Sequence, residues 1–186
     1  MYEKRRLKKI AILDVDGSLS DHQHRLPLIT GESRKGRENW ESFYAMQYND
    51  VPYEPAVLAA LAWQDEYVIA IFTGRPKEYE IDTKMWLEKQ GIRVDFMFMR
   101  PTKDFRPMVE LKNAWLDDVI DMGFEVAVVL EDHPGVVESF RERGLFVMQP
   151  TNHWIEYKGK ETQDGQAYPD GSEQVGGLPS GSDSQD

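Results

Sequence analysis

A run of four apolar residues that ends abruptly at two aspartates constrains the fold of this chain most strongly. Residues 10–13 (IAIL) have the character of a strand that is buried on both faces of a sheet. Asp14 and Asp16 follow, and side chains two residues apart in an extended chain project to the same side. Gly17 then lets the backbone turn away. We therefore expect two carboxylates at the C-terminal end of a buried strand, where open α/β sheets bind ligands.

Apolar segments typical of strands alternate with segments typical of helices over most of the remaining chain. Strands are predicted over residues 67–72, 94–99, 125–130 and 145–148, and helices over residues 51–65, 78–90, 108–122 and 136–143. Pro76 is expected in the first turn of the second helix. This alternation predicts right-handed βαβ units. The expected fold is α/β, a Rossmann-like three-layer sandwich with a central parallel five-stranded sheet.

Two segments differ in character from this body, which we expect to span residues 1–155. Residues 21–50 are polar and locally basic, and we expect a small flap over the site, too short for a separate cap domain. Inside it, Trp40, Phe43 and Tyr44 have the spacing of one apolar helix face. Residues 156–186 are dominated by Gly, Ser, Asp, Gln and Pro, and are expected to be an acidic, disordered tail.

Composition excludes several classes of function. The chain has no cysteine, so it has no disulfide, thiolate nucleophile or zinc–thiolate site. A net charge of −11 argues against a protein that coats nucleic acid, although a local basic patch could hold one strand end. No apolar run has the length of a membrane span, and the basic N-terminus precedes too short an apolar run for a signal peptide. We expect a soluble, cytoplasmic protein.

His22 and His24 are a weak candidate for a metal site. They lie two residues apart with no third ligand nearby, which favours solvated loop residues over a zinc site.

Polar residues follow two of the predicted strands and one lies in a predicted helix. They are Thr73, Gly74 and Arg75 after the second strand, Lys112 in the third helix, and Glu131 and Asp132 after the fourth strand. Because the C-terminal ends of parallel strands share one edge, these groups can meet Asp14 and Asp16. Crowded carboxylates with no cysteine favour Mg²⁺, and Mg²⁺ with a lysine and a hydroxyl suits phosphoryl oxygens.

The order of these motifs resembles that of the haloacid-dehalogenase-like (HAD) phosphohydrolase superfamily. The matching segments are DVDGS at 14–18, FTG at 72–74, the isolated Lys112, and the acidic pair at 131–132, and the resemblance extends over about residues 8–150. A closer similarity is to the 3′-phosphatase domain of bacteriophage-type polynucleotide kinase–phosphatases and stand-alone phage relatives. It depends on TGRP at 73–76, Tyr79, Trp86, Leu87, MRP at 99–101, DFRP at 104–107 and EDHPGVVE at 131–138.

The resemblance implies a phosphatase domain without a large cap, with defined catalytic roles. Asp14 would be the nucleophile that forms an aspartyl-phosphate, and Asp16 would protonate the leaving alcohol and then activate water. Lys112 would neutralise charge in the transition state, with Lys103 as the competing candidate. The GxxxxGK[ST] motif of the kinase half is absent.

The resemblance also implies metal and substrate ligands. The metal ligands would be Asp14, Asp16 through its backbone carbonyl, Asp132 and the neighbouring Glu131. Ser18 and Thr73 would bind phosphoryl oxygens. The full set of expected phosphate and substrate ligands is Ser18, Thr73, Gly74, Arg75, Arg100 and Arg106. The phage relatives usually have Asp-Asp-Arg where this chain has Glu131-Asp132-His133, so a permanent cation is replaced by a histidine.

Three functions remain open from the sequence. The first is a Mg²⁺-dependent phosphomonoesterase that acts on a nucleic-acid 3′-phosphate or a nucleotide, in the host cytoplasm if the protein is phage-encoded. The second is a deoxynucleoside 5′-monophosphatase or a broad small-molecule phosphatase. The third is a catalytically idle HAD fold that binds a partner through its acidic tail, against which the intact Asp14, Asp16 and Asp132 argue.

Overall fold

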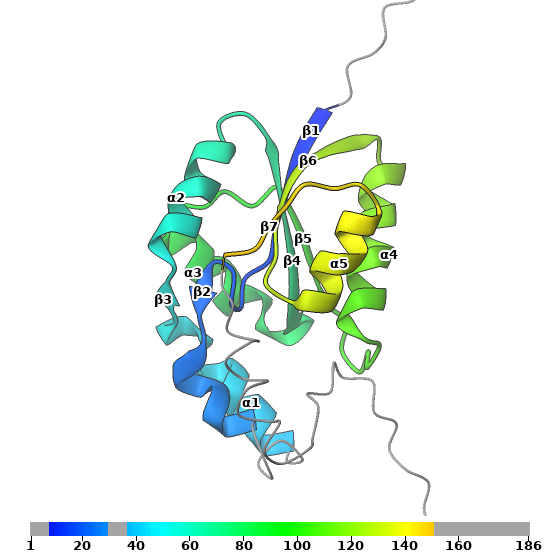
Figure 1. The fold of residues 1–186 in the computed structure, drawn as a ribbon. Coiled ribbons are helices and arrows are strands. Elements are labelled where there is room, and N and C mark those ends of the chain that lie inside the picture. Colours follow the sequence, from blue (N-terminus) through cyan, green and yellow to red (C-terminus); the bar gives the residue numbers. More distant parts are fainter. Residues whose placement is uncertain (1–7, 30–36, 151–186) are drawn as a thin grey trace, which may run out of the picture.

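A five-stranded parallel sheet carries helices on both faces (Figure 1). The computed structural model describes residues 8–29 and 37–150. The strands lie in the order β5-β4-β1-β6-β7, and every adjacent pair is parallel. Their bounds are β1 Lys8–Leu13, β4 Val68–Pro76, β5 Phe96–Arg100, β6 Phe124–Leu130 and β7 Val147–Met148. The predicted α/β three-layer architecture is confirmed.

The central strand β1 explains why its apolar run is continuous. Ile10 and Ile12 pack into the core on one face of the sheet, and Ala11 and Leu13 pack into a second core on the other face. All four side chains are almost completely buried. The first core is covered by α4 (Met108–Asp121) and α5 (Pro134–Glu142), and the second by α2 (Glu54–Trp63) and α3 (Glu80–Lys89) (Figure 1).

The strand register brings the polar residues to one level at the carboxyl edge of the sheet. Leu13, the last residue of β1, is opposite Ile71 of β4 and Leu130 of β6. The Asp14 amide then donates a hydrogen bond of 2.9 Å to the carbonyl of Leu130. The residues that follow the three central strands therefore meet at the same place.

The segment from β2 (Ser20–Asp21) to β3 (Val51–Pro52) extends beyond the carboxyl edge of the sheet (Figure 1). Its other elements are η1 (Gln23–Ile29), α1 (Arg37–Ala45) and η3 (Met46–Asn49). β2 and β3 pair antiparallel and bring the two ends of the segment together. The predicted aromatic helix face is confirmed, since Phe43 is buried and its ring contacts the rings of Trp40 and Tyr44.

β4 continues further than the sequence predicts. It runs through Thr73, Gly74 and Arg75 to Pro76, where the predicted strand ends at residue 72. After an irregularity between Thr73 and Pro76, the chain pairs again with Arg100 of β5. Pro76 is therefore not in the first turn of a helix, and the short η4 (Lys77–Tyr79) separates it from α3.

Three segments lie outside the described residues: 1–7, 30–36 and 151–186. They include the expected acidic tail at 156–186 and part of the expected flap. None of the described helices combines the length and the apolar character needed to cross a membrane.

Candidate active site

Lys112 joins two carboxylates at the carboxyl edge of the sheet. Its Nζ lies 2.6 Å from Asp14 Oδ1 and 2.6 Å from Glu131 Oε2. Asp14 follows β1, Glu131 follows β6, and Lys112 reaches them from the second turn of α4. All three side chains are buried. Lys103, the competing candidate, lies exposed in the loop before α4, so the structure places Lys112 at the predicted nucleophile.

The protonation of Asp14 depends on a balance between burial and Lys112. Burial raises the pKa of the Asp14 carboxyl to about 6, with the Lys112 ammonium lowering it and Glu131 raising it further. Burial alone would lower the pKa of Lys112, but the carboxylates of Asp14 and Glu131 raise it above its usual range. Lys112 therefore remains charged, and Asp14 is readily ionised at neutral pH.

Asp14, Glu131 and Asp132 form a buried carboxylate cluster. One oxygen of each lies within 4.8 Å of the other two. Asp14 Oδ2 has no hydrogen-bond partner within the described residues. Lys112 bonds two of these three carboxylates, Asp14 and Glu131. A divalent cation would offset the repulsion among the three buried acids. An all-oxygen donor set suits Mg²⁺.

Gly17 allows Asp132 to lie in this cluster. Its φ of +86° is a conformation that other residues rarely adopt. A Cβ atom at this position would lie 2.1 Å from Asp132 Oδ2, closer than any van der Waals contact. The turn after the two aspartates therefore needs glycine for two independent reasons.

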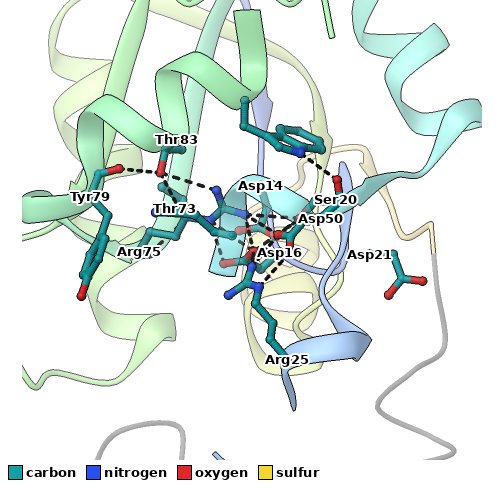
Figure 2. Close-up of polar contacts among 12 residues, drawn as sticks. Asp14, Asp16, Ser20, Asp21, Arg25, Asp50, Thr73, Arg75, Tyr79 and Thr83 are labelled. Atoms are coloured by element: carbon teal, nitrogen blue, oxygen red, sulfur yellow. Dashed lines mark hydrogen bonds and ion pairs between the residues drawn. The ribbon is translucent and has the colours of Figure 1, made fainter. Parts of the chain in front are cut away.

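Asp16 lies in the opposite electrostatic environment from Asp14. Arg75 donates to it at 2.6 Å from Nη2 and 3.1 Å from Nε, and Arg25 Nη2 donates a further short hydrogen bond (Figure 2). Burial raises the pKa of Asp16, but the guanidiniums of Arg25 and Arg75 outweigh it and hold that pKa far below its usual range. The two aspartates therefore share a site but differ in proton affinity.

Asp50 completes a buried cluster of two arginines and two carboxylates. It accepts from Arg25 at 2.6 and 2.8 Å and from Arg75 at 2.9 Å (Figure 2). Ser20 Oγ also donates to Asp50 at 3.1 Å. The side chains of Arg25, Arg75 and Asp50 are fully buried. The paired charges are thus mutually satisfied, and the cluster anchors the segment between β2 and β3 to Asp16.

Sequence reasoning did not select Arg25 or Asp50 as site residues. Arg25 lies in the polar segment 21–50, where exposure is the usual expectation for an arginine. His24 is also part of this network, because its Nε2 lies 2.9 Å from Asp50 Oδ1, whereas solvated loop histidines were expected. For His22, burial lowers the pKa, and its ring packs edge-on against Phe43 at 6.3 Å.

Ser18 follows Asp16 in the turn after β1, and Thr73 lies in β4. Both are fully buried. Ser18 Oγ has no hydrogen-bond partner within the residues that the structure describes, and Thr73 Oγ1 accepts from the Arg75 amide at 3.2 Å. Gly74 follows Thr73, and a Cβ there would lie 3.1 Å from Met108 Sδ. The binding of phosphoryl oxygens by these two hydroxyls stays a prediction.

Three arginines that were expected to bind substrate have protein partners. Arg75 belongs to the buried cluster. Arg100 donates to the carbonyls of Asp104 at 2.9 Å and Arg106 at 2.8 Å, and Arg106 pairs with the Asp104 carboxylate at 2.7 Å. Arg100 and Arg106 thus brace the loop between β5 and α4, and their contact with substrate stays a prediction.

The family described as "Polynucleotide kinase PNKP phosphatase domain" matches residues 8–153. The chain belongs to this family. It is a HAD-type phosphatase related to the phosphatase domain of polynucleotide kinase–phosphatase, and the predicted family resemblance is confirmed. No curated protein sequence matches it significantly.

Solved structures agree with this assignment. A chain from the structure of the Pnkp1/Rnl/Hen1 RNA repair complex is 25% identical, with a TM-score of 0.64, and the match covers 80% of this chain and 44% of that one. A chain of a second Pnkp1/Rnl/Hen1 complex is 26% identical over 80% and 48%, with a TM-score of 0.61. This chain therefore spans less than half the length of these relatives.

A more distant structure shares the fold alone. The class C acid phosphatase from Bacillus anthracis with tungstate bound is 9% identical, with a TM-score of 0.58, and the match covers 79% of this chain and 69% of that one.

Proposed function

We propose that this protein is a Mg²⁺-dependent phosphomonoesterase in which Asp14 is the nucleophile. The observation that carries the proposal is the environment of Asp14, whose Oδ1 bonds an ammonium and whose Oδ2 has no partner among residues 8–29 and 37–150. Asp14 would attack phosphorus, the bond from phosphorus to the leaving alcohol would break, and an aspartyl-phosphate would form. Water would then hydrolyse this intermediate and release phosphate.

Asp16 would move the proton in both steps. Arg25 and Arg75 favour its ionised form, which is the form that removes a proton from water in the second step. In the first step Asp16 must carry a proton to the leaving alcohol. The negative charge of the substrate's phosphate group favours that protonated form by like-charge repulsion.

The carboxylate cluster fits a magnesium ion. Asp14, Glu131, Asp132 and the backbone carbonyl of Asp16 would hold it. Bound Mg²⁺ supplies positive charge that offsets the repulsion between the Asp14 carboxylate and the phosphate group. Lys112 would add fixed positive charge next to Asp14, and Ser18 and Thr73 would orient phosphoryl oxygens.

The substrate that we propose is a nucleic-acid 3′-phosphate or a nucleotide. Membership of the PNKP phosphatase-domain family supports it, as does similarity to a chain of an RNA repair complex. The described part of the segment from β2 to β3 contains one short α-helix and no cap-sized domain, which leaves room for a polymer end. A deoxynucleoside 5′-monophosphatase or a broad small-molecule phosphatase is the second candidate.

A substrate panel tests this proposal. The panel compares a 3′-phosphorylated oligonucleotide, deoxynucleoside 5′-monophosphates and glycerol 2-phosphate, each with Mg²⁺ and with EDTA. We expect the highest kcat/KM on the oligonucleotide and no turnover in EDTA. Asp14→Asn should lower kcat at least ~10³-fold, since it removes the nucleophile. Asp117→Asn, on the surface of α4, is the matched control.

Three results would overturn parts of the proposal. Retained activity in Asp14→Asn would exclude this nucleophile, and full activity in EDTA would exclude the metal. Equal or better turnover of the 5′-monophosphates would favour the second candidate. The idle-fold alternative is tested by removing residues 159–186, which lie outside the described residues, and we expect that truncation to leave catalysis unchanged.

A further inference from the structure

The loop between β5 and α4 presents an aromatic side chain to solvent. Phe105 is 77% exposed, the largest exposed fraction among the large apolar side chains of the described residues. Exposing a phenyl ring is unfavourable, and single exposed apolar residues are common on protein surfaces. Phe105 differs from an ordinary exposed apolar residue because hydrogen bonds fix the loop that carries it.

The loop is fixed by hydrogen bonds on both sides of Phe105. Arg100 Nη1 donates to the carbonyls of Asp104 and Arg106, the residues on either side of it. The Arg106 amide and guanidinium both donate to the Asp104 carboxylate, at 3.0 and 2.7 Å. Lys103 adopts a φ of 65°, a left-handed conformation that residues other than glycine rarely adopt. The exposed ring is thus held by a rigid, partly strained loop.

This loop borders the proposed phosphate site. Met108, the first residue of α4, lies 2.6 Å from Arg100 Nη2 through its sulfur and packs against Gly74 beside Thr73. Thr102 Oγ1 donates to Glu78 Oε2 at 2.9 Å, which ties the loop to η4 just beyond Pro76. The loop therefore contacts the chain on either side of Arg75, and α4 carries Lys112 one turn after Met108.

The charged residues beside Phe105 indicate which kind of molecule binds to this exposed ring. Lys103 and Arg106 lie in the same loop, and although Arg106 pairs with Asp104, Lys103 leaves this loop with a net positive charge in a chain whose net charge is −11. An exposed aromatic ring beside cations is the combination that binds single-stranded nucleic acid, since bases stack on the ring and phosphates are attracted to the cations. A second protein would instead need a broader apolar surface than one ring.

We infer that Phe105 stacks against a nucleobase of the strand whose 3′-phosphate occupies the site, and so selects polynucleotide ends over small phosphate esters. This inference rests on the proposed function. Phe105 would act in binding alone, because it does not contact Asp14 or Lys112. Its loss should therefore raise KM for an oligonucleotide and leave kcat unchanged.

Kinetics on two substrates test the inference. KM and kcat are measured on a single-stranded 3′-phosphorylated oligonucleotide and on glycerol 2-phosphate, which has no base. Phe105→Ala should raise KM about 5- to 100-fold on the oligonucleotide, from the usual strength of base stacking, and change neither constant on glycerol 2-phosphate. Phe105→Trp should restore the wild-type KM because tryptophan also stacks.

Phe146→Ala is the matched control. Phe146 is the same residue type with a similar exposed fraction, 69%, but it lies immediately before β7. β7 and β5, the strand that leads into the Phe105 loop, are the outermost strands on opposite sides of the sheet. We expect Phe146→Ala to match the wild type on both substrates.

A binding measurement separates failure of this inference from failure of the proposed function. In an Asp14→Asn background, fluorescence anisotropy of a labelled 3′-phosphorylated oligonucleotide should show the same weakening by Phe105→Ala. An unchanged oligonucleotide KM and affinity in Phe105→Ala, or equal losses on both substrates, would overturn the role of Phe105. If the wild type hydrolyses no oligonucleotide but its binding still depends on Phe105, the proposed activity fails and the stacking role stands.

Discussion

Lys112 Nζ lies 2.6 Å from Asp14 Oδ1, although 98 residues separate the two in sequence. The contact connects the end of β1 to α4 across the carboxyl edge of the sheet. Lys112 also bonds Glu131, so both acids share one buried ammonium. The protonation and the reactivity of the proposed nucleophile therefore depend on Lys112.

Replacing Lys112 by methionine should impair the chemical step and alter its pH dependence. Because the Lys112 ammonium lowers the pKa of Asp14, its loss should raise that pKa and move the acid limb of the kcat profile to higher pH. Loss of the charge should also lower kcat by about 10²- to 10³-fold at the optimum. Steady-state rates on glycerol 2-phosphate from pH 5 to 9 would measure both effects.

Lys84→Met is the matched control for the Lys112 substitution. Lys84 pairs with Glu80 on the exposed side of α3, and we expect its loss to leave the pH profile unchanged. A Lys112→Met enzyme whose acid limb coincides with that of the wild type would contradict the electrostatic role of the ammonium.

Asp14 should make the stability of the metal-free protein depend on pH. Burial raises its pKa from 3.8 to about 6, so between these values the folded protein binds more protons than the unfolded chain. Stability should therefore fall as the pH rises from about 4 to about 6. Asp14→Asn cannot ionise, so its stability relative to wild type should improve by about 3 kcal/mol between pH 4 and pH 7.

Urea unfolding in EDTA at these two pH values would measure the difference. The comparison of variant with wild type at each pH cancels the titration of groups that both proteins share. A stability difference that is the same at pH 4 and pH 7 would mean that the buried Asp14 carboxyl has an ordinary pKa.

Gly17→Ala should damage the metal site as well as the turn. A Cβ at this position would lie 2.1 Å from Asp132 Oδ2, so the Asp132 carboxylate must move. The rise in melting temperature on adding Mg²⁺ should then shrink or disappear, because binding to the folded state is weakened. Calorimetry with and without Mg²⁺ gives this readout independently of activity.

Gly144→Ala separates backbone strain from damage to the site. Gly144 has a similar φ, +80°, but a Cβ there would meet no atom within 4 Å. We expect this variant to lose about 1–2 kcal/mol of stability and to keep the full response to Mg²⁺. A full response in Gly17→Ala would show that Asp132 is not needed for the metal.

The sequence predicted the sheet and the carboxylate cluster because both depend on local patterns. The run at residues 10–13 could only be a strand buried on both faces, and parallel strands bring Asp14, Glu131 and Asp132 to one edge. The end of β4 was predicted too early because Pro76 suited the first turn of a helix, whereas β4 resumes its pairing with β5 at Pro76. That pairing depends on the partner strand and cannot be seen in the segment itself.

The buried arginine cluster could not be predicted in the same way. Arg25 lies in a polar segment, and burial of an arginine is favourable only when carboxylates meet it in the folded chain. Asp50 supplies one of those carboxylates from 25 residues further along, with no periodicity that connects the two. Their pairing is a property of the tertiary structure alone.

Asp50→Asn should therefore be among the more destabilising substitutions in this protein. It would leave Arg25 and Arg75 buried with Asp16 as their remaining carboxylate, and breaking a buried charge network typically costs about 3–5 kcal/mol. Glu80→Gln is the matched control, because Glu80 pairs with two lysines on the surface of α3, where such pairs contribute at most about 1 kcal/mol. Urea unfolding of both variants at pH 7 would compare them. Equal losses would show that Asp50 contributes no more than a surface ion pair, and that the cluster is not what anchors the segment between β2 and β3 over the site.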